Sequence, residues 1–198
     1  MKYSGGTFSV HKLTICDEQF TIVGHICTTN GRIPGVDRIA AIRNWGPCRN
    51  ISELRTFLGT VSLLCMFIKN FTLRVHHLNK LKHKDVLFEF GPQQIATQED
   101  LKNAALTCPA LKPIDYKSDL PVILSVNTSY IAVRFYLCQQ DPTAPQRRTY
   151  SRFDSITLND REVRFSQPKL EIYSLYHALR KFRLYLLGVR NLIVKTDM

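Results

Sequence analysis

Apolar residues recur at spacings of three and four between residues 51 and 68, within the stretch NISELRTFLGTVSLLCMFIKNF. This spacing places them on one face of a helix. Asn50 or Ser52 can cap the first turn by accepting a hydrogen bond from a free backbone N–H. Shorter helices are expected at about 36–43 and 73–81. The pattern therefore predicts a small helical segment in the first half of the chain.

The second half of the chain mixes helical and strand patterns. Gly91-Pro92 opens a helix, since proline in a first turn needs no N–H, and Gly188 is placed to close a later one. The expected order is a helix at 92–106, strands at 121–127, 131–139 and 147–156, a long helix at 168–187 and a last strand at 191–196. We therefore expect an α/β (α+β) fold, in which a β-β-β-α-β domain with a mixed, five-stranded sheet follows the helical segment.

Polar residues stand at the ends of three of these elements. Asn127 ends the first strand of that domain, Glu171 lies in the first turn of the long helix, and Asp197 follows the last strand. If the last strand pairs with the first and the helix packs across the sheet, the three residues can converge. Carboxylates there would hold Mg²⁺, and two ions about 3.5–4 Å apart could promote phosphodiester hydrolysis. Each residue also has an ordinary structural explanation, such as a turn or a helix dipole.

The composition adds a strong positive charge. Lys and Arg number 27 against 16 Asp and Glu, which gives a formal net charge of +11. This balance favours an anionic partner, most simply nucleic acid. The sequence has no apolar run long enough to span a bilayer and no signal-peptide pattern at its start. Its six cysteines form no CxxC pair, which suits a reducing compartment. We expect an intracellular protein without a membrane partner, and the choice between cytoplasm and nucleus stays open.

Four stretches, in order, carry a resemblance to a known family. They are "IVGHICTTNGRIPGVDRIAAIRNW" (22–45), "ELRTFLGTVSLLCMFIKNF" (53–71), "FEFGPQQIATQEDLKNAALTCPALKPIDY" (88–116) and "SLYHALRKFRLYLLGVRNLIVKTD" (174–197). Together they resemble the pol polyprotein of gypsy-type LTR retrotransposons, especially fungal copies. The resemblance implies the end of a reverse transcriptase palm at 1–45, thumb helices at 46–85, and an RNase H-like domain, C-terminally truncated, at 86–198.

The resemblance also assigns site residues. "NTS" stands where the family has "DAS" or "DSS", so Asn127 takes the place of the first RNase H aspartate. Glu171 matches the helix glutamate and Asp197 the aspartate of "TD"; these two carboxylates would bind Mg²⁺, with Mn²⁺ as the alternative ion. Arg134 replaces a glycine that is usual in the family. A fourth carboxylate would lie beyond Met198, and the "Y.DD" motif of the polymerase site does not occur in the sequence.

The parent activity implied is RNA-directed DNA synthesis and hydrolysis of RNA in RNA/DNA hybrids. We expect impaired catalysis in this chain, because an amide at Asn127 carries no charge. In an alternative hypothesis the chain is an active nuclease in which Asp154 or Asp160 completes the metal site with Glu171 and Asp197.

In another alternative the chain is a non-catalytic, basic nucleic-acid-binding module that grips the phosphates of a duplex. Its candidate contacts are Arg55, Lys69, Arg74, Lys80, Lys82 and Lys84. The expected partners are an RNA/DNA hybrid or another nucleic acid and the remainder of a pol polyprotein. We also expect apolar surface to be exposed on the sheet, where a further helix of the family would pack, and this surface favours aggregation.

Overall fold

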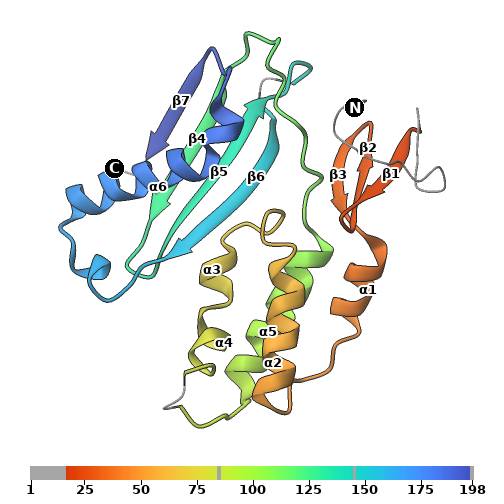
Figure 1. The fold of residues 1–198 in the computed structure, drawn as a ribbon, viewed down its shortest axis with the longest axis vertical. Helices are drawn as coiled ribbons and strands as arrows, with labels where there is room; N and C mark the ends of the chain where they lie inside the picture. The colour runs from red at the N-terminus through yellow and green to blue at the C-terminus, as the bar shows by residue number, and fades with distance from the viewer. Residues whose placement is uncertain (1–16, 84–85, 145, 197–198) are drawn as a thin grey trace, which may run out of the picture.

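The computed structural model describes residues 17–83, 86–144 and 146–196. A four-stranded sheet with a long helix against it forms one end of the molecule, and shorter helices form the other end (Figure 1). A small three-stranded sheet lies beside the shorter helices. The mixed α/β architecture predicted from the sequence is therefore confirmed.

The small sheet is an antiparallel meander formed by the first described residues. Its strands are β1 (Gln19–Ile22), β2 (His25–Thr28) and β3 (Gly31–Pro34), in that order. Arg32 exchanges two backbone hydrogen bonds, of 2.7 and 2.8 Å, with Leu111 in the later connector. Gly31 has a φ of 127°, and a Cβ atom there would lie 2.7 Å from the Leu111 carbonyl oxygen. Only glycine fits this close approach.

The helical segment contains α1 (Val36–Arg43), α2 (Ile51–Ser62), α3 (Phe71–Arg74), α4 (His76–Lys80) and α5 (Pro92–Leu106). Of the two expected caps for α2, Asn50 is the one that forms: its Oδ1 accepts a hydrogen bond of 2.8 Å from the Glu53 N–H. The apolar residues of α1, α2, α4 and α5 meet in one core, which includes Ile42, Phe57, Leu78 and Leu101.

Two of the predicted helices differ in the structure: the first ends early and the second is divided in two. Helix α2 ends at Ser62, and the following residues continue in tight turns, with hydrogen bonds such as that from the Leu64 N–H to the Val61 carbonyl. The helix expected at 73–81 is instead α3 and α4, which are separated at Val75. Leu64, Phe67 and Ile68, which lie beyond Ser62, are still buried. Periodicity thus marks burial correctly here, although the backbone leaves the helical path.

The larger sheet has the order β6-β5-β4-β7. Its strands are β4 (Val122–Thr128), β5 (Ala132–Gln140), β6 (Arg148–Thr157) and β7 (Leu192–Thr196). Strand β7 pairs parallel to β4, and the other pairs are antiparallel, so the sheet is mixed. The expectation of a fifth strand is wrong for the described part of the chain, because residues 86–144 and 146–196 supply only four segments to this sheet.

Helix α6 (Gln167–Leu186) covers one face of this sheet. Alternate residues of β4, namely Val122, Leu124 and Val126, pack in a core with residues of the helix. Phe182 is fully buried there, and its ring meets that of Phe135 edge to face with centroids 5.1 Å apart. The sequence prediction that the helix packs across the sheet is confirmed, as is the expected glycine after the helix: Gly188 has a φ of 88°.

The helical segment packs on the opposite face of the sheet, at β5 and β6. Phe153 belongs to the helical core, and Tyr136 and Tyr150 pack against it. The Phe153 N–H donates a hydrogen bond of 3.0 Å to the Met66 carbonyl. The sheet is thus covered by α6 on one side and partly by the helical segment on the other.

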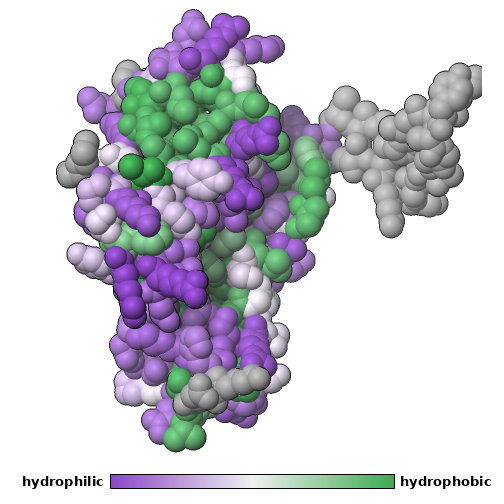
Figure 2. Space-filling model, turned by 60° about the vertical axis from the view of Figure 1, so that its left-hand side comes forward, coloured by the Kyte–Doolittle hydropathy of each residue, from purple (hydrophilic) through white to green (hydrophobic). Residues whose placement is uncertain are grey.

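Strand β7 stays open to solvent. Leu192, Ile193 and Val194 are each 37–40% exposed, and α6 adds exposed apolar residues such as Ile172 and Leu184. Figure 2 shows a continuous apolar area over the end of the molecule that carries the four-stranded sheet. The expected exposed apolar surface is therefore present. Among the described residues, no helix has both the length and the apolar character needed to cross a membrane.

Replacing Phe182 with alanine tests the core between sheet and helix. Truncating a fully buried phenylalanine leaves a cavity, so we expect the free energy of unfolding to fall by about 3–5 kcal/mol. Urea denaturation would measure the change. The control is Tyr176→Ala on the same helix, which is 56% exposed and should change stability by less than about 0.5 kcal/mol. Equal losses in the two variants would contradict the packing described.

A charge on the open strand tests the apolar surface. We expect Ile193→Lys to reduce self-association, because a lysine on an edge strand disfavours pairing with a second chain. Light scattering over a concentration series would measure the average mass. Arg190→Lys, which conserves charge outside the strand, is the control. An unchanged concentration dependence in Ile193→Lys would show that this surface does not drive association.

Candidate functional site

Asn127 lies near the end of β4, on the sheet face turned away from α6. Leu124 and Val126 of the same strand lie on the opposite face from Asn127 and pack in the core with α6. Across the ladder Asn127 is paired with Arg134 of β5. The Arg134 Nη2 donates a hydrogen bond to the Asn127 Oδ1. The register of β4 and β5 therefore places side by side Asn127 and Arg134, the two residues that differ from the family pattern.

A cavity of about 220 Å³ opens beside this pair. It is lined by Lys69, Asn70, Ser125, Asn127, Arg134 and Tyr136. Lys69 and Asn70 come from the turn between α2 and α3, whereas the other lining residues come from β4 and β5. None of the lining side chains is a carboxylate, and two are cations. The cavity is consequently electropositive.

Glu171 lies on α6 and accepts a hydrogen bond of 3.0 Å from the Gln167 side chain. One helical turn further on, Ser174 accepts a hydrogen bond of 2.8 Å from the Thr128 hydroxyl. This contact fixes the first turns of α6 at the end of β4 that also carries Asn127. Glu171 is thus near the end of that strand, but its helix is on the other face of the sheet.

Asp197 lies outside the described residues. The strand that leads to it is placed as expected, because β7 pairs with β4 and Thr196 is opposite Val126. Within residues 17–83, 86–144 and 146–196, no group of three His, Cys, Asp or Glu side chains could hold a metal ion. Whether Asn127, Glu171 and Asp197 act together stays a prediction.

The two substitute carboxylates have other surroundings. The Asp154 side chain is 10% exposed and lies 3.8 Å from Arg152 and 3.9 Å from Lys181. Asp154 therefore offsets the charge of two cations, one partly exposed and one exposed, on the α6 face of the sheet. Asp160 lies in the exposed turn before the 3₁₀ helix η2 (Glu162–Arg164).

The start of α6 is held by a second contact. The Tyr173 hydroxyl donates a hydrogen bond to the Glu162 carboxylate. This bond favours the neutral phenol and raises the pKa of Tyr173 to about 12, while the same bond lowers the pKa of Glu162. The pair fixes η2 against the helix that carries Glu171.

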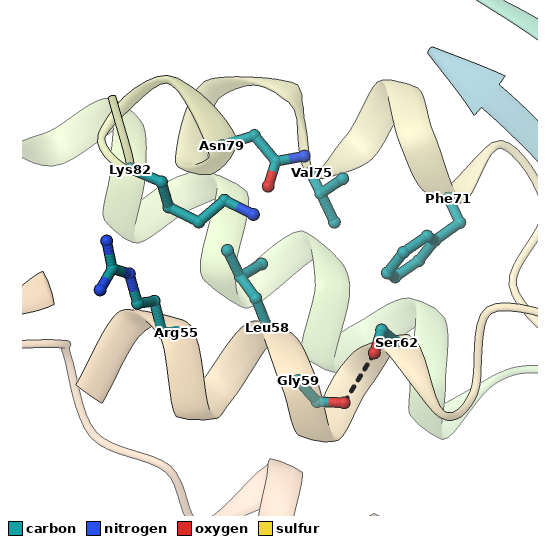
Figure 3. Close-up of a pocket in the computed structure, with 8 residues that line it drawn as sticks. All are labelled: Arg55, Leu58, Gly59, Ser62, Phe71, Val75, Asn79 and Lys82. Carbon is teal, nitrogen blue, oxygen red and sulfur yellow. Dashed lines mark hydrogen bonds between the residues drawn. The ribbon is translucent and has the colours of Figure 1, made fainter. Parts of the chain in front are cut away.

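A groove of about 350 Å³ crosses the helical segment between α2 and the α3–α4 pair. Figure 3 shows Arg55 and Lys82 at one end of it, with Phe71 and Ser62 at the other. Arg55 and Lys82 are both exposed, although they are far apart in the sequence. The structure therefore brings two of the predicted phosphate contacts together.

The other predicted cationic contacts are distributed differently. Lys69 belongs to the cavity beside Asn127, where its Nζ lies 5.6 Å from the centre of the Tyr136 ring. Arg74 forms an ion pair with Asp100, which offsets its charge. Lys80 is exposed on α4, and Lys84 lies outside the described residues. The six cations thus form no single continuous row among the described residues.

Ser125, Tyr136 and Asn70 line the same cavity as Asn127, although the sequence prediction did not include them. Strand alternation could have indicated Ser125, because residues two apart on a strand share a face. Tyr136 and Asn70 carried no such signal, since their positions depend on strand register and on a distant turn.

Residues 90–194 match the family described as the RNase H-like domain found in reverse transcriptase. The Transposon Tf2-3 and Tf2-4 polyproteins of Schizosaccharomyces pombe are each 26% identical to this chain over 168 residues, which is 85% of the chain and 12% of each polyprotein. The chain thus spans about an eighth of the length of these relatives. The resemblance to retrotransposon pol polyproteins is confirmed.

Solved structures share the fold over most of the chain. The foamy viral protease-reverse transcriptase in complex with an RNA/DNA hybrid has a TM-score of 0.75 and 18% identity, and covers 96% of this chain and 25% of its own. The foamy viral protease-reverse transcriptase dRH in complex with ds DNA has a TM-score of 0.74 and 19% identity, and covers 91% of this chain and 31% of its own. Because the family match spans more than half of the 198 residues, the chain belongs to the family of RNase H-like domains found in reverse transcriptases.

Proposed function

We propose that this chain is a fragment of a retrotransposon reverse transcriptase/RNase H that binds an RNA/DNA hybrid but hydrolyses its RNA strand weakly or not at all. The parent protein would carry RNA-directed DNA synthesis and RNase H activity. The polymerase aspartates expected from the resemblance are absent from this sequence. The proposal therefore concerns the RNase H-like site and the surface that meets the duplex.

The contact between Arg134 and Asn127 is the observation that supports impaired catalysis. RNase H-like domains generally use Mg²⁺, and two such ions need several negative charges around them. Here the uncharged amide oxygen is already bonded to a guanidinium, and Lys69 adds a second positive charge to the same cavity. These charges repel a divalent cation. The residues around Asn127 therefore do not fit Mg²⁺, even though Glu171 lies near the strand end.

Loss of one ligand is enough to slow such a reaction strongly. Each 1.36 kcal/mol of lost transition-state stabilisation lowers the rate tenfold. The amide of Asn127 in place of a carboxylate removes a charged metal ligand, and Arg134 in place of a glycine adds repulsion, so the two departures act in the same direction. The alternative, an active nuclease completed by Asp154, is disfavoured by the ion pairs that Asp154 already makes.

Hybrid binding is supported by the groove that Arg55 and Lys82 line. Exposed cations of this kind contact backbone phosphates, and A-form-like duplexes are recognised largely through their phosphates and 2′-hydroxyls. The net charge of +11 adds long-range attraction. The similar viral enzyme that carries an RNA/DNA hybrid makes this duplex the first partner to test.

The catalytic half of the proposal predicts no metal-dependent cleavage by the parent chain. A labelled RNA/DNA hybrid would be incubated with the parent and with Glu171→Gln, in Mg²⁺ and then in Mn²⁺. We expect both proteins to stay at the background rate. Cleavage by the parent that Glu171→Gln abolishes would show that the site works with an amide, and the proposal would be wrong.

Restoring the family residues tests the physical reason. We expect the double variant Asn127→Asp/Arg134→Gly to cleave the hybrid at least about tenfold faster than the parent, because a carboxylate replaces the amide and the competing cation is gone. The single variant Asn127→Asp is the control. Its new carboxylate still faces Arg134, so its gain should be smaller. Equal rates in both variants would show that Arg134 does not block the site.

The binding half predicts a salt-dependent affinity that depends on the groove. Fluorescence anisotropy would measure hybrid binding at salt concentrations from about 50 to 200 mM. Over this range, binding that releases counterions from the phosphates weakens strongly. We expect Arg55→Ala/Lys82→Ala to weaken binding and to reduce the salt slope by about one per cation removed. Lys117→Ala/Lys112→Ala, which removes two exposed cations from the connector, is the matched control. A similar change in both variants would assign binding to net charge alone.

A further inference from the structure

The cavity beside Asn127 has features that the proposed hybrid binding does not use. It lies between the turn after α2 and strands β4 and β5, apart from the groove that Arg55 and Lys82 line. Its volume of about 220 Å³ is far above the roughly 10–15 Å³ that one water needs. We propose that this cavity is a binding site for a phosphate group, which Arg134 and Lys69 hold without a metal ion.

The walls of the cavity are held in place by bonds between distant segments. The Thr72 N–H and hydroxyl lie 3.1 and 2.7 Å from the Ser155 hydroxyl. At the other end of the same turn, the Met66 carbonyl accepts the Phe153 N–H at 3.0 Å. The turn that carries Lys69 is therefore fixed to β6 at both ends. A site built this way exists before any ligand arrives, which lowers the entropic cost of binding.

Arg134 supplies the main recognition group. A guanidinium carries five N–H donors in a planar fork that matches the oxygens of a phosphate. One of its nitrogens donates to Asn127, and its Nε is buried without a hydrogen-bond partner. A buried donor without a partner lowers stability, so an anionic oxygen that accepts from this group would be favoured. The amide of Asn127 orients the guanidinium and leaves its charge intact.

Lys69 and the neutral groups complete the site. The Lys69 ammonium lies over the Tyr136 ring, at 5.6 Å from its centre, and is thereby held at the cavity. Ser125 and Tyr136 bring hydroxyl groups, which can donate to phosphate oxygens. With two cations and no carboxylate among the lining residues, the site favours an anion with more than one negative charge. A phosphate monoester, which carries about −1.5 to −2 at neutral pH, matches this charge.

Isothermal titration with inorganic phosphate, at an ionic strength kept constant with chloride, tests the site directly. We expect the parent chain to bind phosphate saturably and Asn127→Asp to bind at least about tenfold more weakly. This change keeps the shape of the side chain but neutralises Arg134. Asn103→Asp makes the same charge change on the exposed face of α5 and should bind like the parent. Lys69→Gln, at an exposed position, should also weaken binding.

The proposal is wrong if the parent binds no phosphate, or if Asn127→Asp binds as tightly as the parent while circular dichroism shows both to be folded. Arg55→Ala/Lys82→Ala should bind phosphate normally, so failure of hybrid binding and failure of this site are distinguishable. Competition identifies the source of the phosphate. Displacement by a nucleoside 5′-monophosphate indicates a terminal phosphate, displacement by an oligonucleotide without terminal phosphates indicates a backbone phosphate, and displacement by neither restricts the site to inorganic phosphate.

Discussion

Packing on both faces of the β4-β5-β6 ladder is the constraint on which the rest of this structure depends. On one face, alternate residues of β4 and β5 meet α6 in a core closed by Phe135 and Phe182. On the other face, Tyr136, Tyr150 and Phe153 join the core of the helical segment. Because successive residues of a strand point to opposite faces, the two cores are fixed relative to each other by the strand register. The helical segment and the sheet are held together by this shared layer.

The same constraint produces the polar cavity. Residues of β4 and β5 that do not face α6 are turned toward the helical segment, but apolar contact covers only part of that face. Ser125, Asn127 and Arg134 lie at the end of the ladder, where the turn after α2 passes over them. A cation and an amide there are adjacent because they are direct partners in the ladder. The cavity is thus electropositive because the register of β4 and β5 places a cation, Arg134, beside an uncharged amide, Asn127.

Electrostatics then decides which ligands suit the two surfaces. A divalent cation would meet positive charge beside Asn127, whereas an anion would gain from it. In the groove on the helical segment, Arg55 and Lys82 are exposed to solvent and their interactions with phosphates are screened by salt. Arg74 differs from both, because Asp100 already offsets its charge. The chain therefore combines an open groove lined by Arg55 and Lys82 with a more enclosed cavity lined by Lys69 and Arg134, and the proposed binding of a hybrid and of a phosphate group rests on these positive charges.

The sequence by itself determined the features that depend on neighbouring residues. Helices α1 and α5 have the predicted bounds, and for α5 the signals were local ones, namely Pro92 in the first turn and the adjacent Gly91. The order of helices and strands along the chain and the family resemblance also came from the sequence, and with them the attention to Asn127 and Arg134. The boundaries expected at residues 45 and 85 stay predictions, although α5, which follows residue 85, shares one core with α1, α2 and α4.

Only the tertiary structure decided the features that depend on distant residues. Helix α2 ends at Ser62, and the turns after it are joined to a distant strand by the hydrogen bond from the Phe153 N–H to the Met66 carbonyl. The bond between Arg134 and Asn127 requires one register of β4 and β5, since a slip of one residue would turn one of them to the other face. Lys69 reaches the same cavity only because that turn packs on the sheet. Local pattern fixes which elements form, whereas long-range pairing fixes which side chains meet.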